Sequence, residues 1–177
     1  MIGPIGGTTY YLSGPRYDRL VTGPDDAETD DLVLDAATGL VRMSFLVQSR
    51  YATTATAHDL TPQQAQLLCI VKDRPRPMAE LVQILHMDKS SVSGLVDRVV
   101  QRGFLRRRPS PTDRRAVVVE ATAKGRRRGD AFFEAMAREM NDVVDQLDPP
   151  DRVRLAELLS DIVRAESVPA VFGEVAG

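Results

Sequence analysis

The chain has 177 residues, of which 43% are hydrophobic and 27% are charged, and its formal net charge is −2. This size fits one compact domain or two small lobes that share a core, and the composition excludes disorder throughout. The sequence holds no run of about eighteen apolar residues, and no basic flank precedes an apolar run at the amino terminus. We therefore expect neither a membrane span nor a secretory signal, and a cytoplasmic location.

Few residues are available for metal binding or catalysis. The chain has a single cysteine, Cys69, and two histidines, His58 and His86. These are too few for a zinc site, so we predict no metal and no cofactor. Neither histidine has a serine or cysteine nucleophile in a recognisable setting, and no glycine-rich phosphate loop occurs, so we predict that the protein is not an enzyme. Cys69 lies among apolar residues and is expected to act as a small hydrophobe, with oxidant sensing as the alternative.

The charges are strongly segregated along the chain. Residues 88–128 contain twelve Lys and Arg against four Asp and Glu, a net charge of +8, whereas residues 129–177 carry a net charge of −7. One cationic block is thus embedded in an acidic protein. This distribution is typical of a chain with one lobe that faces nucleic acid.

The first half of the chain predicts an arm followed by three helices. Residues 1–29 are rich in glycine and proline and indicate a flexible arm. Apolar residues at helical spacing predict a long amphipathic helix over 31–57. Thr61-Pro62-Gln63-Gln64 forms a capping box that opens a helix over 62–72. Two prolines precede a further short helix over 78–85.

The second half predicts a helix, a hairpin and two more helices. Asp88 caps a helix with one apolar face, which Gly103 ends. Strand-like runs at 104–108 and 116–120 flank a basic loop and predict a hairpin. Thr122 then caps a second long helix, and Asp148 caps the last one. The predicted fold is therefore mainly α with a small β-hairpin.

The order of the central elements is typical of a winged helix-turn-helix, in which the second helix enters the major groove of DNA and the hairpin is the wing. Short serine side chains lie near the positive amino terminus of that helix, and arginines are suited to phosphate and to the narrow minor groove. Asp113 is expected to brace a wing arginine. The alternative is that the arginines form only a solvated face. The predicted DNA-binding residues are Ser90, Ser91, Ser93, Arg98, Arg108, Arg114 and Arg115.

These residues resemble those of the MarR (multiple antibiotic resistance regulator) family of winged-helix transcription factors, over roughly residues 31–166. The resemblance is carried by several motifs together: Leu60-Thr61-Pro62-Gln63-Gln64, Glu80-Leu81, Lys89-Ser90-Ser91-Val92-Ser93, Leu95-Val96-Asp97-Arg98, Arg102-Gly103-Phe104, the wing signature Asp113-Arg114-Arg115, and Thr122-Ala123-Lys124-Gly125. Three positions depart from the family pattern. Gly94 replaces a larger residue that faces the bases, Ala121 replaces a leucine, and His86 replaces a glycine in the turn, where histidine tolerates a left-handed backbone.

The resemblance implies a homodimer whose first and last helices intertwine, which binds a pseudo-palindromic operator and releases it when a small aromatic or anionic ligand, or an oxidant, reshapes the dimer. Long terminal helices with continuous apolar stripes agree with burial against a second copy. The expected organisation has five parts: a flexible arm over 1–29, a dimerisation helix over 30–60, a winged helix-turn-helix lobe over 61–121, dimerisation helices over 122–167 and a tail over 168–177.

The effector pocket is expected where the dimerisation helices meet the DNA-binding lobe. Phe45, Arg50, Tyr51 and Leu68 are the candidate lining residues, and each fits plain core equally well. The sequence thus predicts a ligand-responsive regulator that binds double-stranded DNA, more often a repressor than an activator. The alternative is a winged helix that has lost DNA binding and docks an acidic protein partner.

Overall fold

The structure, a computed structural model, describes residues 34–110 and 116–169 of the chain. The chain divides into two compact units, Met1–Gly39 and Leu40–Gly177. The described part of the first unit is the start of helix α1 (Ala36–Ala57), where the Asp35 carboxylate accepts the backbone N–H of Thr38 at 2.9 Å. All the other helices and strands belong to the second unit.

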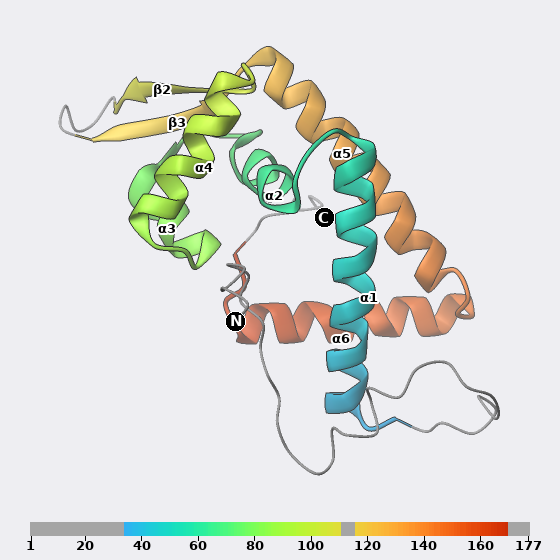
Figure 1. Cartoon of the computed structure of the whole chain (residues 1–177). Coiled ribbons are helices and arrows are strands. Elements are labelled where there is room, and N and C mark those ends of the chain that lie inside the picture. Colours follow the sequence, from blue (N-terminus) through green and yellow to red (C-terminus); the bar gives the residue numbers. More distant parts are fainter. Residues whose placement is uncertain (1–33, 111–115, 170–177) are drawn as a thin grey trace, which may run out of the picture. The chain divides into compact units, whose positions relative to one another are not determined.

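The helices of the second unit follow the predicted order (Figure 1). The predicted boundaries agree with the observed ones to within one or two residues, except that α1 begins five residues later than expected. No helix in the described part of the chain is long and apolar enough to span a membrane. The helices are α2 (Pro62–Val71), α3 (Met78–Leu85), α4 (Lys89–Gln101), α5 (Ala123–Val144) and α6 (Pro149–Ala165).

Three of the predicted caps, Thr61, Asp88 and Thr122, form side-chain hydrogen bonds, whereas Asp148 occupies the N-cap position of α6 without one. The Thr61 hydroxyl accepts the backbone N–H of Gln64, and the Gln64 side chain accepts the backbone N–H of Thr61, which completes the capping box of α2. The Thr122 hydroxyl likewise caps α5. Gly103 follows the end of α4 with φ of 73°, a left-handed conformation that glycine adopts without steric cost. Local sequence therefore fixes where these helices begin and end.

The hairpin consists of β2 (Leu105–Pro109) and β3 (Val117–Ala121), paired antiparallel with Leu105 opposite Ala121. A two-residue strand that the sequence did not predict, β1 (Arg76–Pro77), pairs with the other edge of β3, so the sheet order is β1-β3-β2. The hairpin extends beside α4 (Figure 1). The hairpin and α4 therefore pack directly against each other.

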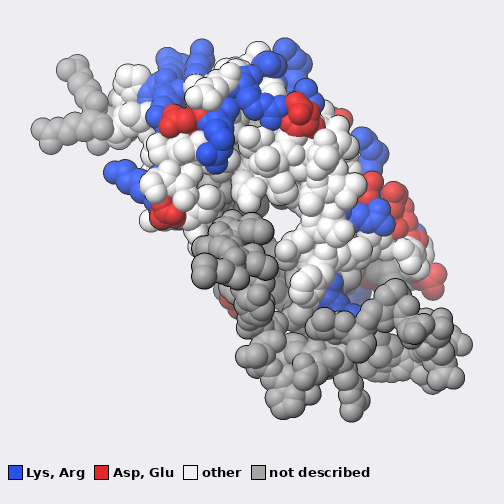
Figure 2. Space-filling view, in the orientation of Figure 1, with Lys and Arg blue, Asp and Glu red and all other residues white. Residues whose placement is uncertain are grey.

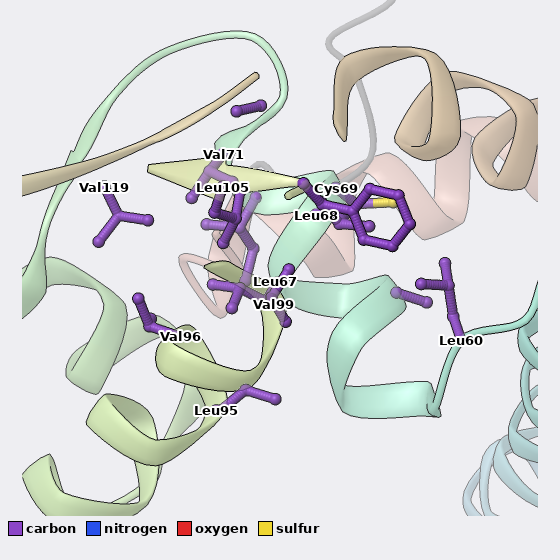
Figure 3. Packing of buried hydrophobic residues seen from close by; sticks show 14 of the residues in the cluster. Leu60, Leu67, Leu68, Cys69, Val71, Leu95, Val96, Val99, Leu105 and Val119 are labelled. Carbon is purple, nitrogen blue, oxygen red and sulfur yellow. The ribbon is translucent and has the colours of Figure 1, made fainter. Parts of the chain in front are cut away.

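The core of the second unit lies between α2, α4, α5 and the sheet. Leu67 and Leu68 of α2 and Val96 and Val99 of α4 belong to one hydrophobic cluster, in which Leu67 lies beside Val99, and all four are fully buried (Figure 3). Phe132 of α5 is also fully buried and packs edge-on against Tyr51 of α1, with ring centroids 5.0 Å apart. Close packing of this kind holds the outer face of α4 in a fixed position.

Candidate nucleic-acid interface

Helix α4 is joined to α3 by a tight turn that sets its direction. His86 ends α3 with φ of 49° and ψ of 39°, the left-handed conformation that the sequence predicts for this position. Val92, Leu95, Val96 and Val99 lie on the buried face of α4. Its outer face carries Lys89, Ser90, Asp97, Arg98 and Gln101, all exposed. The two helices thus form a helix-turn-helix with a polar outer surface.

The amino terminus of α4 is organised around the carboxylate of Asp88. This carboxylate accepts the backbone N–H of Ser91 at 2.9 Å and the Ser91 hydroxyl at 2.6 Å, and it also accepts the Ser90 hydroxyl. Hydrogen bonds from the hydroxyls of Ser90 and Ser91 hold the pKa of Asp88 well below its usual range. Asp88 is therefore ionised at neutral pH and fixes both serine side chains.

Arg107 links the wing to α4. Its guanidinium donates to the Ser93 hydroxyl oxygen at 3.2 Å and lies 3.1 Å from the Asp97 carboxylate. Both partners belong to α4, whereas Arg107 belongs to β2. The contact ties α4 to the hairpin, and strand alternation places the neighbouring Arg106 and Arg108 on the opposite face of β2.

The two arginines on either side of Arg107 point to Glu120 of β3. Arg106 and Arg108 both form ion pairs with the Glu120 carboxylate, and the Arg108 distance is 3.3 Å. Burial alone would raise the pKa of Glu120, but the hydrogen bonds from these two arginines outweigh it and lower the pKa. Each arginine side chain stays 57% exposed. Arg108, a predicted DNA contact, is thus held near Glu120 and remains accessible.

The other predicted contacts fall into two groups. Arg98 is exposed on the outer face of α4, with its guanidinium beside Gly94, where an added Cβ would lie 3.4 Å from Nη1. Arg114, Arg115 and the expected brace Asp113 lie outside the described residues. Figure 2 shows Lys and Arg side chains gathered over the hairpin, α4 and the start of α5.

Sequence reasoning missed a cluster of three cations around the ring of Phe104. These cations come from the end of α4 and from the first turns of α5. The Phe104 ring is buried, and the cationic groups of Arg102, Lys124 and Arg128 lie 4.9, 4.8 and 5.8 Å from its centroid. Each cation over the ring is attracted by the electron-rich face. The Arg128 guanidinium also donates to the His58 carbonyl at 2.9 Å.

Arg102 extends this cluster to the loop between α1 and α2. Its guanidinium donates to the Gln64 side chain at 2.9 Å and forms an ion pair with Asp59. Gln64 is the buried glutamine of the α2 capping box. The carboxyl end of α4 is therefore fixed to the first turn of α2.

Comparison with known proteins decides the family. A family model described as MarR family matches residues 58–116. The HTH-type transcriptional repressor NicR of Pseudomonas putida is 31% identical over 109 residues, which cover 60% of this chain and 68% of that protein. The chain belongs to the MarR family.

Other relatives agree with this membership. The HTH-type transcriptional regulator PecS of Dickeya dadantii is 24% identical over 70% of this chain and 76% of its own length. The crystal structure of RV1404 from Mycobacterium tuberculosis matches with a TM-score of 0.66 and 26% identity, over 77% of this chain and 98% of that one. Wild-type MarR from E. coli shares the fold, with a TM-score of 0.67 at 19% identity over 75% of this chain and 99% of that one. This MarR-family chain is a DNA-binding transcriptional regulator.

A cavity of about 420 Å³ lies between α1 and the beginning of α2. None of the described residues that line it is charged. Among the candidate residues for an effector pocket, Tyr51 lines this cavity, whereas Arg50 forms an ion pair with Glu139 at 2.7 Å. Phe45 is 66% exposed and Leu68 is fully buried in the core, and neither lines the cavity. The lining residues are Val47, Gln48, Tyr51, Ala52, Pro62, Gln63 and Gln66.

Cys69 is buried in α2, and burial raises the pKa of its thiol to about 12. Because the thiolate is the reactive form, we expect alkylation of Cys69 by iodoacetamide at pH 8 to be slower in the native protein than in urea by on the order of 100-fold or more. Mass spectrometry of timed samples measures both rates. Equal rates would contradict the buried placement.

Within the described ranges, no three His, Cys, Asp or Glu side chains are grouped so that they could hold a metal ion.

Proposed function

We propose that the chain is a ligand-responsive repressor that binds a pseudo-palindromic operator as a homodimer in the cytoplasm, and that it has no enzymatic activity. The observation that carries this proposal is the exposed polar face of α4, flanked by the arginine-rich wing within a block of net charge +8. Ser90, Ser91, Ser93 and Arg98 would lie in the major groove. Arg114 and Arg115 would enter the adjacent minor groove.

The dimer is proposed on the exposed apolar residues of the terminal helices. No residue of α6 is buried, although the helix carries four large aliphatic residues. Their side chains are each 43–52% exposed: Leu158, Leu159, Ile162 and Val163. A second copy would cover these side chains, in agreement with dimerisation helices over 30–60 and 122–167. Two-fold symmetry would then place the two recognition helices about 34 Å apart, one turn of DNA.

The effector is proposed to bind in the cavity between α1 and α2. Glutamine, tyrosine and apolar side chains line it. Glutamine offers both hydrogen-bond donors and acceptors but no charge, so this lining suits an uncharged aromatic compound better than an anion. Thermal-shift screening of matched neutral and acidic aromatic compounds would rank the two classes.

The experiment that tests the function is selection of bound fragments from random duplex DNA. An enriched inverted repeat is expected, because it reports sequence specificity and dimerisation together. Enrichment of single half-sites would contradict the dimer. Absence of any enriched sequence, together with a flat dependence of affinity on salt, would favour the alternative of a protein-interaction module, since a binder that neutralises about six phosphates has a salt slope near −5.

Arg115 provides the test of the wing. We expect Arg115→Ala to weaken operator binding by on the order of 1–3 kcal/mol, because the substitution removes one arginine contact to the DNA. Fluorescence anisotropy over a salt series measures both affinity and slope. Arg164→Ala removes the same charge from α6, where Arg164 pairs with Asp161, and serves as the control. Wild-type affinity in Arg115→Ala would argue against the wing contact.

A further inference from the structure

Three serines of the recognition helix differ in the direction of their hydrogen bonds. Ser90 and Ser91 donate their hydroxyl protons to the Asp88 carboxylate, whereas the Ser93 oxygen accepts from the Arg107 guanidinium. A hydroxyl has one proton and two lone pairs. The partner that each hydroxyl already has therefore decides what it can still offer to DNA.

Ser90 and Ser91 can offer only acceptors. An ionised carboxylate has no proton to give, so both hydroxyl protons must point to Asp88. The pKa of Asp88, held well below its usual range by these same bonds, keeps the carboxylate ionised. Donation to a carboxylate also polarises a hydroxyl and makes its oxygen a better acceptor. The lone pairs of Ser90 remain accessible, because this residue is exposed on the outer face of α4.

Ser93 has the opposite arrangement. A guanidinium has only donors, so one lone pair of the Ser93 oxygen is used by Arg107, at 3.2 Å, and its proton stays available. Ser93 can thus donate to a phosphate oxygen or to an acceptor on a base. Serines of the same helix therefore present opposite groups to DNA: Ser90 and Ser91 present acceptors, and Ser93 presents a donor.

Only one class of DNA group matches Ser90 and Ser91. Phosphate oxygens are acceptors, as are O6 and N7 of guanine and O4 of thymine, whereas the amino groups N6 of adenine and N4 of cytosine donate in the major groove. The negative charge of Asp88 next to these serines also disfavours a phosphate and favours an amino group. We propose that Ser90 and Ser91 determine specificity by accepting hydrogen bonds from adenine or cytosine amino groups and are not phosphate contacts. This inference rests on the proposed DNA-binding function.

The test compares the sequences selected from random duplex DNA by wild type, Ser90→Ala and Ser93→Ala. We expect wild type to prefer adenine or cytosine on one strand at a defined position of each half-site. Ser90→Ala should relax that single preference about tenfold, a typical value for one base pair, and leave the salt slope unchanged. Ser93→Ala is the matched control, because it should leave the same preference intact.

Asp88→Asn should reverse the direction of the hydrogen bond between residue 88 and the Ser91 hydroxyl, while it keeps the helix cap. Asparagine is as good an N-cap as aspartate, so its oxygen should retain the Ser91 backbone N–H. Its NH2 group then replaces the oxygen that accepts the Ser91 hydroxyl, and it can only donate. The Ser91 proton is released towards the DNA. We expect the preference at the Ser91 position to shift from an amino-bearing base to guanine or thymine.

Two kinds of failure are distinguishable. If wild type enriches an operator but Ser90→Ala lowers affinity for all sequences equally and reduces the salt slope by about one, the serine is a phosphate contact and the inference is wrong. An unchanged base preference in Ser90→Ala and in Asp88→Asn would equally overturn it. If wild type enriches no sequence, the proposed function itself fails, and the role of the serines with it. Melting temperatures of all variants establish that each one is folded.

Discussion

Gly125→Ala should strongly destabilise the junction between α5 and the start of the hairpin. A Cβ at this position would lie 1.9 Å from the carbonyl oxygen of Phe104 and 2.8 Å from its carbonyl carbon. Both are backbone atoms, so no side-chain rotation can relieve the clash, and α5 must move away from the start of β2. We expect a loss of about 3 kcal/mol or more, at the upper end of what overpacking costs.

The displacement also breaks hydrogen bonds at the same junction. The Thr122 backbone N–H donates to the Phe104 carbonyl at 2.9 Å, and the Gly125 N–H donates to the Thr122 hydroxyl at 3.0 Å. Thermal unfolding should show a melting temperature lower by roughly 10 °C. Gly129→Ala is the control in the same helix, because its Cβ would make ordinary contacts of 3.5–3.7 Å with Lys72 and Leu68. That variant should be neutral or more stable by up to about 1 kcal/mol. Equal melting temperatures for Gly125→Ala and wild type would contradict the close approach.

Ile162→Glu should disrupt the proposed dimer and remove operator binding. Four large aliphatic residues of α6 are about half exposed, so covering them in a dimer is worth on the order of 1 kcal/mol each per protomer. A carboxylate among them would be buried without a partner charge in the proposed dimer. We expect the dimer to weaken at least about 100-fold, and DNA affinity with it, because one half-site contact replaces two.

Sedimentation velocity and operator titration measure this effect. The winged-helix lobe should stay folded, since α6 contributes no residue to the core. Glu157→Lys changes charge on the polar face of α6 and should leave the dimer intact. A dimeric Ile162→Glu that binds the operator like wild type would exclude α6 from the interface.

The fold could be predicted in detail where short-range chemistry determines it. The capping box at Thr61, the left-handed His86 and the glycine at 103 each leave a local signal in the sequence, and the structure confirms all three. Strand β1 escaped prediction because two residues, one of them proline, carry no strand pattern. Its formation depends on the edge of β3, which only the tertiary fold supplies.

The sequence predicted which residue types form the candidate site, but it did not predict which residues pair with each arginine. Charge counting identified the basic block, yet it treated the wing arginines as equivalent. The strand alternation turns Arg107 towards α4 and its two neighbours towards Glu120. Likewise, Arg102 and Arg128 lie 38 and 70 residues along the chain from the atoms that they bond. Such long-range contacts have no periodic trace in a single sequence.

The first turn of α2 borders two features at once. Pro62, Gln63 and Gln66 line the cavity, while Gln64 accepts the Arg102 guanidinium at the end of α4. The wall of the cavity and the carboxyl end of α4 are therefore connected through a single capped helical turn.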